Sequence, residues 1–158
     1  MTKPEFIYTT YIKSTVDKVW NAITNPEFTR QYWGERANAS DWKKGSKWKH
    51  VDDEGGVYVG GEVLESARPK LLVLSWVDPE NPADHSKVTF ELEQIEDQVR
   101  LNVVHGDFQP GSIMADKVTK GWPVVLSSLK SFLETGKALN VWAVTDSKCV
   151  PARLAATA

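Results

Sequence analysis

The chain has 158 residues, of which 41% are hydrophobic and 25% are charged, and its formal net charge at pH 7 is -2. This length suits one globular domain with its own core, and the charge balance leaves no basic surplus for a nucleic-acid backbone. No window approaches the ~20 consecutive apolar residues of a membrane-spanning helix. We therefore expect one domain that binds neither nucleic acid nor a membrane.

The cysteine content and the N-terminal sequence indicate a reducing compartment. Cys149 is the only cysteine, so it has no partner for an intrachain disulfide or a thiolate zinc site. The N-terminal segment MTKPEFIY lacks the apolar run of a signal peptide. We expect a cytoplasmic protein. Its unusual feature is seven tryptophans, which are typical of an aromatic core or of an apolar ligand cavity.

The N-terminal third predicts one strand and two short helices. Residues 6–13 are aromatic and β-branched, which is typical of a strand covered on one face. Residues 14–17 have the spacing of a capping box, and apolar side chains then recur at helical spacing over residues 16–23. Pro26 ends this helix and begins a second one, PEFTRQYW, which Gly34 terminates.

Residues 37–105 change to an alternating pattern with turn signals, which predicts an antiparallel meander. The turns are predicted at residues 43–47, 52–56, 67–69 and 96–98, and the longer strands at residues 57–66, 71–77, 87–95 and 99–105. Residues 78–85 (DPENPADH) are polar and contain two prolines, so we predict an exposed loop there. The Gly60-Gly61 pair indicates a strand kink or bulge.

A long amphipathic helix is predicted to close the domain. Residues 122–133 carry a continuous apolar stripe, and Gly136 provides the C-terminal stop. Ser112 is a candidate N-cap, in which case Pro123 lies inside one helix and bends it.

These segments resemble, in order, the bacterial family named for its similarity to the C-terminal domain of the heat-shock protein 90 ATPase activator. That family belongs to the SRPBCC superfamily, together with START and Bet v 1 proteins. The resemblance covers about residues 4–136 and rests on VDKVWNAITNPEFTRQYW, WKKGSKWKH, GGEVLE, LLVLSWV, VTFELEQ, LNVVHGDF and GWPVVLSSLKSFLE.

The resemblance implies an α+β helix-grip fold, in which a curved antiparallel sheet wraps a long C-terminal helix. We expect residues 1–137 to form this single domain and residues 138–158 to be an extension, partly ordered or disordered. Within the extension, NVWAV is strand-like. Trp142 either belongs to a partly docked segment with a frayed end or covers a groove or a partner subunit.

Gly121-Trp122-Pro123 lies inside the long helix and has two interpretations. Glycine permits close approach and proline permits a bend, so Trp122 can close the mouth of a cavity between helix and sheet. Alternatively Trp122 simply fills the core, as aromatic residues at helical spacing usually do.

Candidate ligand-binding residues are large apolar side chains, with one histidine, that the predicted elements direct to the interior. His105 has the alternation of Val99, Leu101 and Val103, whereas His50 and His85 are predicted to lie on the surface. The complete set of candidates is Trp33, Trp48, Trp76, Phe90, His105, Phe108, Trp122 and Leu126.

Catalysis has little support in the sequence. The chain has no G-x-S-x-G, P-loop or H-E-x-x-H motif, and its three histidines and one cysteine are scattered, so we predict no metal site and no cofactor. His105 is the one candidate acid-base residue, with the alternative that it is a hydrogen-bonded histidine that fixes the following loop.

Three functions remain open. The first is a binding protein for a small hydrophobic or aromatic molecule, in a cavity between the sheet and the long helix. The second is a chaperone-related interaction protein, possessing a protein partner and a role in stress response, which the resemblance implies. The third is an enzyme similar to polyketide cyclases, with His105 and Tyr58 or Glu62 in proton transfer. The sequence is compatible with a monomer or a homodimer.

Overall fold

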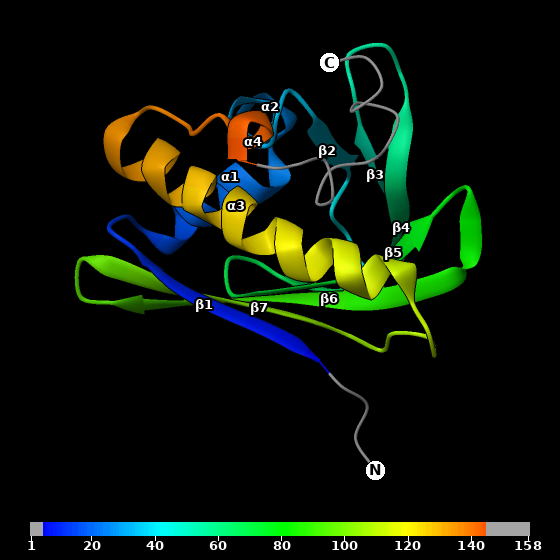
Figure 1. Cartoon of the computed structure of the whole chain (residues 1–158). Helices are drawn as coiled ribbons and strands as arrows, with labels where there is room; N and C mark the ends of the chain where they lie inside the picture. Colours follow the sequence, from blue (N-terminus) through cyan, green and yellow to red (C-terminus); the bar gives the residue numbers. More distant parts are fainter. Residues whose placement is uncertain (1–4, 145–158) are drawn as a thin grey trace.

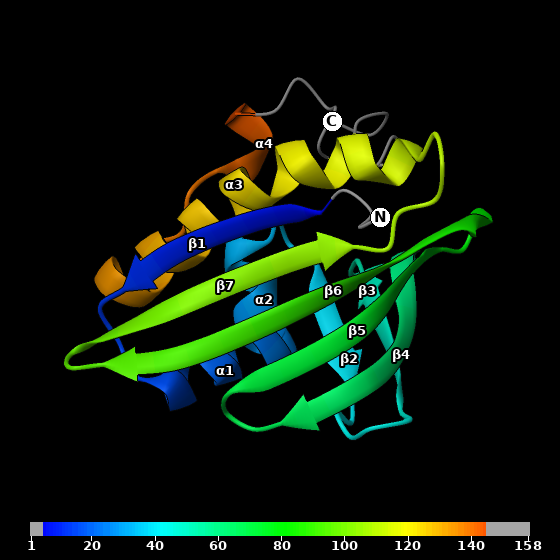
Figure 2. The same ribbon diagram turned by 90° about the horizontal axis from the view of Figure 1, so that it is seen from below.

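The computed structural model of the chain describes residues 5–144. Its centre is a seven-stranded antiparallel sheet with strand order β1-β7-β6-β5-β4-β3-β2. The helices all lie on one face of this sheet, and the longest, α3, crosses that face (Figures 1 and 2). This arrangement is the α+β helix-grip architecture that the sequence predicts.

The order of elements follows the sequence pattern closely. The strands are β1 (Phe6–Ile12), β2 (Ala37–Ser40), β3 (Lys47–Val51), β4 (Val57–Ala67), β5 (Leu71–Asp78), β6 (Asn81–Ile95) and β7 (Gln98–Gly106). The helices are α1 (Val16–Thr24), α2 (Pro26–Tyr32), α3 (Ile113–Thr135) and α4 (Val141–Val144).

The sheet curves toward the helices at the β2–β4 end, where these strands rise beside α3 (Figure 1). Register shifts occur in this half of the sheet, among them one between Val63 and Glu65 against β5. Gly61 has a φ of 155°, and a Cβ there would lie 2.3 Å from the carbonyl oxygen of Ser75. Close backbone approach and a bulge are two features that let a sheet curve.

The predicted loop at residues 78–85 is wrong, because β6 already begins at Asn81, which pairs with Asp78 across a tight turn. The polar pattern is explained by exposure of Asn81, Pro82 and Ala83. Asp84, in contrast, is buried and accepts hydrogen bonds from the Ser112 hydroxyl at 2.5 Å and the Met114 amide at 2.9 Å. This contact ties β6 to the start of α3.

Helices α1 and α2 begin where side chains satisfy their first amides. The N-cap of α1 is Thr15, one residue later than the capping box suggested, and its hydroxyl accepts from Lys18 N at 3.3 Å. Asn25 caps α2 by accepting from Glu27 N at 2.9 Å, with Pro26 in the first turn.

Helix α3 is one continuous helix, as predicted. Ser112 is its N-cap and accepts from Ala115 N at 3.0 Å, while Gly136 ends it in the left-handed conformation with a φ of 82°. Pro123 lies inside it, and Gly121 and Trp122 are both buried. Among the described residues, no helix is long and apolar enough to cross a membrane.

The chain beyond α3 folds back onto the domain. Leu139 N donates to the Ser128 hydroxyl at 3.1 Å, and Val141 is buried. Residues 141–144 form the short helix α4, so the strand-like interpretation of NVWAV is wrong. Trp142 is half-buried, and its ring lies so close to Gly34 that a Cβ there would be 2.5 Å from it. The rest of the extension, residues 145–158, lies outside the described residues.

Candidate functional site: an aromatic cluster under the long helix

Seven of the eight candidate residues form one group of contacting rings between the sheet and α3. We call this group the aromatic cluster. Its members come from the C-cap of α2, four strands, the loop after β7 and α3: Trp33, Trp48, Trp76, Phe90, His105, Phe108 and Trp122. The eighth, Leu126, is buried one turn of α3 after Trp122.

Trp122 is the centre of the aromatic cluster. Its ring centroid lies 5.5 Å from those of Trp33 and Trp76. Phe90 meets it edge-on at 5.8 Å. Trp48 extends the row along the sheet by packing 5.4 Å from Trp76. These separations are those of favourable tilted and edge-to-face aromatic pairs. The indoles therefore bridge α3 to the β3–β5 side of the sheet.

Two members of the cluster, Trp33 and Phe108, are half-buried, whereas the others are buried. Trp33 is the C-cap of α2, and Phe108 stacks on His105 at 4.9 Å. Solvent therefore reaches the cluster at its rim and not at Trp122.

His105 is held on both sides of its ring. Trp122 Nε1 donates to His105 Nδ1 at 3.0 Å, so Nδ1 carries no proton. The proton of the neutral ring then lies on Nε2, which is 2.8 Å from the Ser86 hydroxyl oxygen and donates to it. Both nitrogens of His105 are therefore engaged within the protein. His105 positions the Trp122 indole and influences a bound ligand only through that indole.

The electrostatics of His105 follow from its burial. The side chain is 0% exposed, and burial lowers its pKa to about 3, because a charged imidazole would lose its hydration there. His105 is thus neutral at pH 7. Ser86 shares the inward face of β6 with Val88 and Phe90, and this alternation is the sequence signal that identifies it.

The three buried tryptophans of the aromatic cluster differ in how their N–H groups are satisfied. Trp48 Nε1 donates to the Ser75 carbonyl at 2.8 Å, and Trp122 Nε1 donates to His105. Trp76 Nε1 is buried and has no hydrogen-bond partner within the part of the chain that the structure describes. A buried indole N–H without an acceptor is uncommon in a folded protein.

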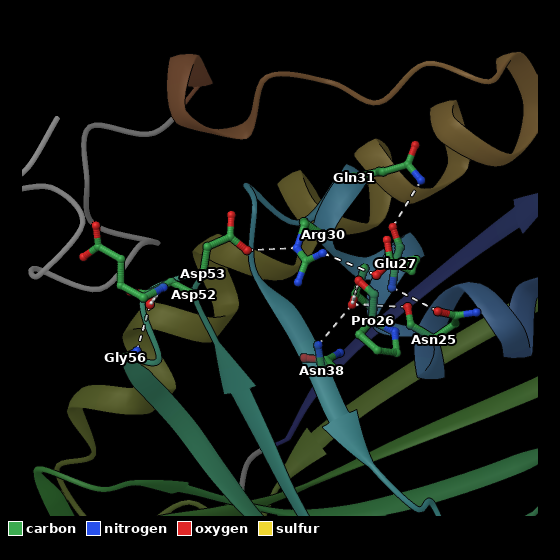
Figure 3. A network of polar contacts seen from close by, with 11 residues as sticks. Asn25, Pro26, Glu27, Arg30, Gln31, Asn38, Asp52, Asp53 and Gly56 are labelled. Carbon is green, nitrogen blue, oxygen red and sulfur yellow. Dashed lines mark hydrogen bonds and ion pairs between the residues drawn. The ribbon is translucent and has the colours of Figure 1, made fainter.

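Polar contacts hold α2 against β2 and the turn after β3 and so position Trp33 (Figure 3). Arg30 Nε lies 3.0 Å from Asp53 Oδ1, in the turn after β3. Asn38 N, in β2, donates to the Thr29 hydroxyl at 3.0 Å. The end of α2 is therefore fixed from two sides.

His50 is buried, so its predicted surface position is wrong. It shares the inward face of β3 with Trp48, an alternation that was available in the sequence. Its Nδ1 is 2.7 Å from Asn38 Oδ1, and its ring packs 4.7 Å from Trp33. Burial, reinforced by the charge of Arg36, lowers the pKa of His50 to about 3.

Arg36 is a second buried polar residue that the sequence pattern does not identify. It is 3% exposed and lies between α2 and β2. Its guanidinium carbon is 3.6 Å from the centroid of the Tyr58 ring, a cation–π contact. Its burial depends on residues far away in the chain, so no local sequence signal marks it.

The residues proposed for proton transfer are engaged elsewhere. The Tyr58 hydroxyl donates to Asp52 Oδ2 at 2.6 Å, and Glu62 pairs with Lys47 at 3.7 Å on the surface. Within residues 5–144, no three His, Cys, Asp or Glu side chains gather as metal ligands would. The described groups most able to hold a ligand are thus aromatic faces and the donors of Trp76 and Arg36.

Most of the chain matches a known protein family. Residues 13–134 match the family described as Activator of Hsp90 ATPase homolog 1-like protein. The chain belongs to this family. The matched segment of this Hsp90 ATPase activator-like domain ends just before Gly136, so α4 and Trp142 lie beyond it. No curated protein sequence matches the chain.

Solved structures share this fold. A protein from Mesorhizobium loti is 26% identical, with a TM-score of 0.70 over 82% of this chain and 96% of that one. The Aha1 dimer from Colwellia psychrerythraea is 22% identical, with a TM-score of 0.70 over 85% and 99% of the two chains. An HSP90 activator from Plasmodium falciparum is 21% identical, with a TM-score of 0.70 over 82% and 95%.

Proposed function

We propose that this protein binds a small hydrophobic or aromatic molecule at the aromatic cluster, between the curved sheet and α3. The ligand presents an apolar face to the indoles and at least one hydrogen-bond acceptor. Access is at the two half-buried members of the cluster, Trp33 and Phe108. Aromatic side chains together with a few polar groups are the usual lining of small-molecule sites.

The observation that carries the proposal is the buried Trp76 Nε1, which has no acceptor among the described residues. Leaving such a donor unpaired costs about 1–3 kcal/mol. The neighbouring indoles of Trp48 and Trp122 both have acceptors, so Trp76 is the one buried indole of the aromatic cluster whose donor is unpaired within the described part of the chain. A ligand carbonyl, ether or hydroxyl oxygen at Trp76 removes this cost.

A thermal-shift screen read together with tryptophan emission tests the proposal. The panel comprises fatty acids, flavonoids, steroids and aromatic polyketide-like compounds, because a ligand that binds only the folded state raises Tm. We expect saturable stabilisation with an emission change by at least one class. Trp76→Phe keeps an aromatic ring, although a smaller one, and removes the donor, and it should weaken binding about 3- to 10-fold.

Trp42→Phe is the matched control, because Trp42 packs against the core and is not a member of the aromatic cluster. It should leave the affinity unchanged. A flat response of the wild-type protein to every class, or equal losses in the two variants, would contradict the proposal.

A protein-interaction role related to the family name is the second candidate. The observation in its favour is the outer face of β1, where Ile7 and Tyr11 are 63% and 45% exposed. An apolar outer face of an edge strand is a place for a partner. Stimulation of the ATPase of heat-shock protein 90 by the wild-type protein, lost in Ile7→Ser, would favour this role. Binding of small molecules without such stimulation would count against it.

We further propose a cytoplasmic protein with one ligand-binding domain at residues 1–137 and a C-terminal extension. Its assembly as a monomer or homodimer is open to measurement by sedimentation. The catalytic alternative is the weakest, because His105 has both nitrogens bonded within the protein.

A further inference from the structure

Arg36 is buried between aromatic rings, yet part of its guanidinium is left without acceptors. Besides Tyr58, the indole of Trp142 contacts it, at 5.2 Å from Cζ to the ring centroid. Within residues 5–144, Nε and Nη2 are buried and have no hydrogen-bond partner. These two atoms form one edge of the guanidinium, whose parallel N–H groups match the two oxygens of a carboxylate.

The surroundings of Arg36 favour a singly charged anion. Burial lowers the pKa of Arg36 to about 10, and the neighbouring Tyr58 and Asp52 oppose this decrease. Arg36 is therefore charged at neutral pH. His50 beside it is neutral and contributes no second positive charge. The Asp52 carboxylate repels a dianion such as phosphate more strongly than a carboxylate, which carries one negative charge.

An aromatic path connects Arg36 to the aromatic cluster. His50, close enough for its charge state to depend on Arg36, packs against Trp33, and Trp33 packs against Trp122 at 5.5 Å. A ligand whose acidic group lies at Arg36 therefore has its body next to this row of rings.

We propose that the ligand is an apolar or aromatic carboxylic acid, and that Arg36 binds its carboxylate through Nε and Nη2. This inference rests on the proposed ligand-binding function and specifies its ligand class. The indole of Trp142, on α4 beyond the family domain, covers the same guanidinium, so α4 closes the anion site.

Paired probes that differ only in charge test the anchor on the full chain. We would titrate 1-naphthaleneacetic acid against 1-naphthaleneacetamide, and dodecanoic acid against dodecanol, by calorimetry at pH 7. We expect the wild-type protein to bind the acid of at least one pair about 10- to 100-fold more tightly than its neutral analogue. Arg36→Met should abolish this preference and retain binding of the neutral analogue.

Arg30→Met is the matched control, because Arg30 is a nearby arginine whose guanidinium is paired with Asp53 at the surface. It should keep the preference for acids. Equal binding of acids and neutral analogues by the wild-type protein overturns the anchor but leaves the proposed function standing. Binding of neither class by the wild-type protein overturns both. These two outcomes need no variant, so they stand even if Arg36→Met fails to fold.

The role of Trp142 has its own variant pair. Gly34→Ala introduces a Cβ that overlaps the Trp142 ring, whereas Gly136→Ala has a similar positive φ and no neighbour within 4 Å. If the indole closes the anion site, Gly34→Ala should speed association of the acid by about tenfold relative to Gly136→Ala. Equal association rates in these two variants would overturn the closing role.

Discussion

Two buried histidines show how single residues set the pH range in which this fold is stable. His50 and His105 are 3% and 0% exposed, and the neutral imidazole of each is hydrogen-bonded within the protein. The pKa of each is lowered to about 3 from an ordinary value of 6.5. The unfolded chain therefore binds protons between pH 6.5 and 3 that the folded chain does not bind.

The free energy of unfolding should accordingly fall as the pH is lowered through this window, by about 1.4 kcal/mol per pH unit for each histidine. The stabilisation is complete above pH 6.5 and is lost progressively below it. Urea unfolding at pH 7.0, 5.5 and 4.5 measures this slope.

His50→Gln and His105→Gln should each remove about half of the slope, while His85→Gln, at an exposed position, is the control. A stability that is constant from pH 7.0 to 4.5, or a slope that neither buried substitution reduces, would contradict this account.

At the scale of elements, the junction between β6 and α3 determines where the long helix begins. Burial raises the pKa of Asp84. Hydrogen bonds from the Ser112 hydroxyl and the amides of Met114 and Ile113 lower it by a larger amount, so the net shift is downward. One carboxylate therefore satisfies helix donors that would otherwise be unpaired. The same helix carries Trp122, so this junction also places the centre of the aromatic cluster.

Asp84→Ala should lower the free energy of unfolding by about 1–3 kcal/mol, because the buried Met114 amide loses its acceptor. Glu80→Ala, at an exposed position in the preceding turn, should change it by less than about 0.5 kcal/mol. Chemical unfolding at pH 7 compares the two. Similar values for both variants would show that the Asp84 contact does not stabilise the start of α3.

At the scale of the whole molecule, periodicity predicted most elements because their patterns are local. The apolar stripe of α3, its cap at Ser112 and its stop at Gly136 all lie within one segment and were predicted correctly. The first residues of β6 were missed because the burial of Asp84 comes from α3, about thirty residues later, and local composition contains no trace of that contact.

The candidate site shows the same difference between local patterns and contacts with distant segments. Alternation on the strands indicated Trp76, Phe90 and His105 as interior residues, and the structure brings them together. Arg36 escaped prediction because its burial comes from Tyr58 on β4 and Trp142 on α4. Sequence patterns thus identify the apolar wall of the site better than its polar groups.

The most direct test of the central claim is a proton–nitrogen NMR titration of the indole groups with a compound that raises Tm. Single Trp→Phe variants assign the signals. We predict that the Trp76 Nε1–H signal shifts on binding, because it gains an acceptor, while that of Trp48, bonded to the Ser75 carbonyl, shifts far less. If saturating ligand leaves the Trp76 signal unchanged and moves only indoles outside the aromatic cluster, the ligand binds elsewhere and the account is wrong.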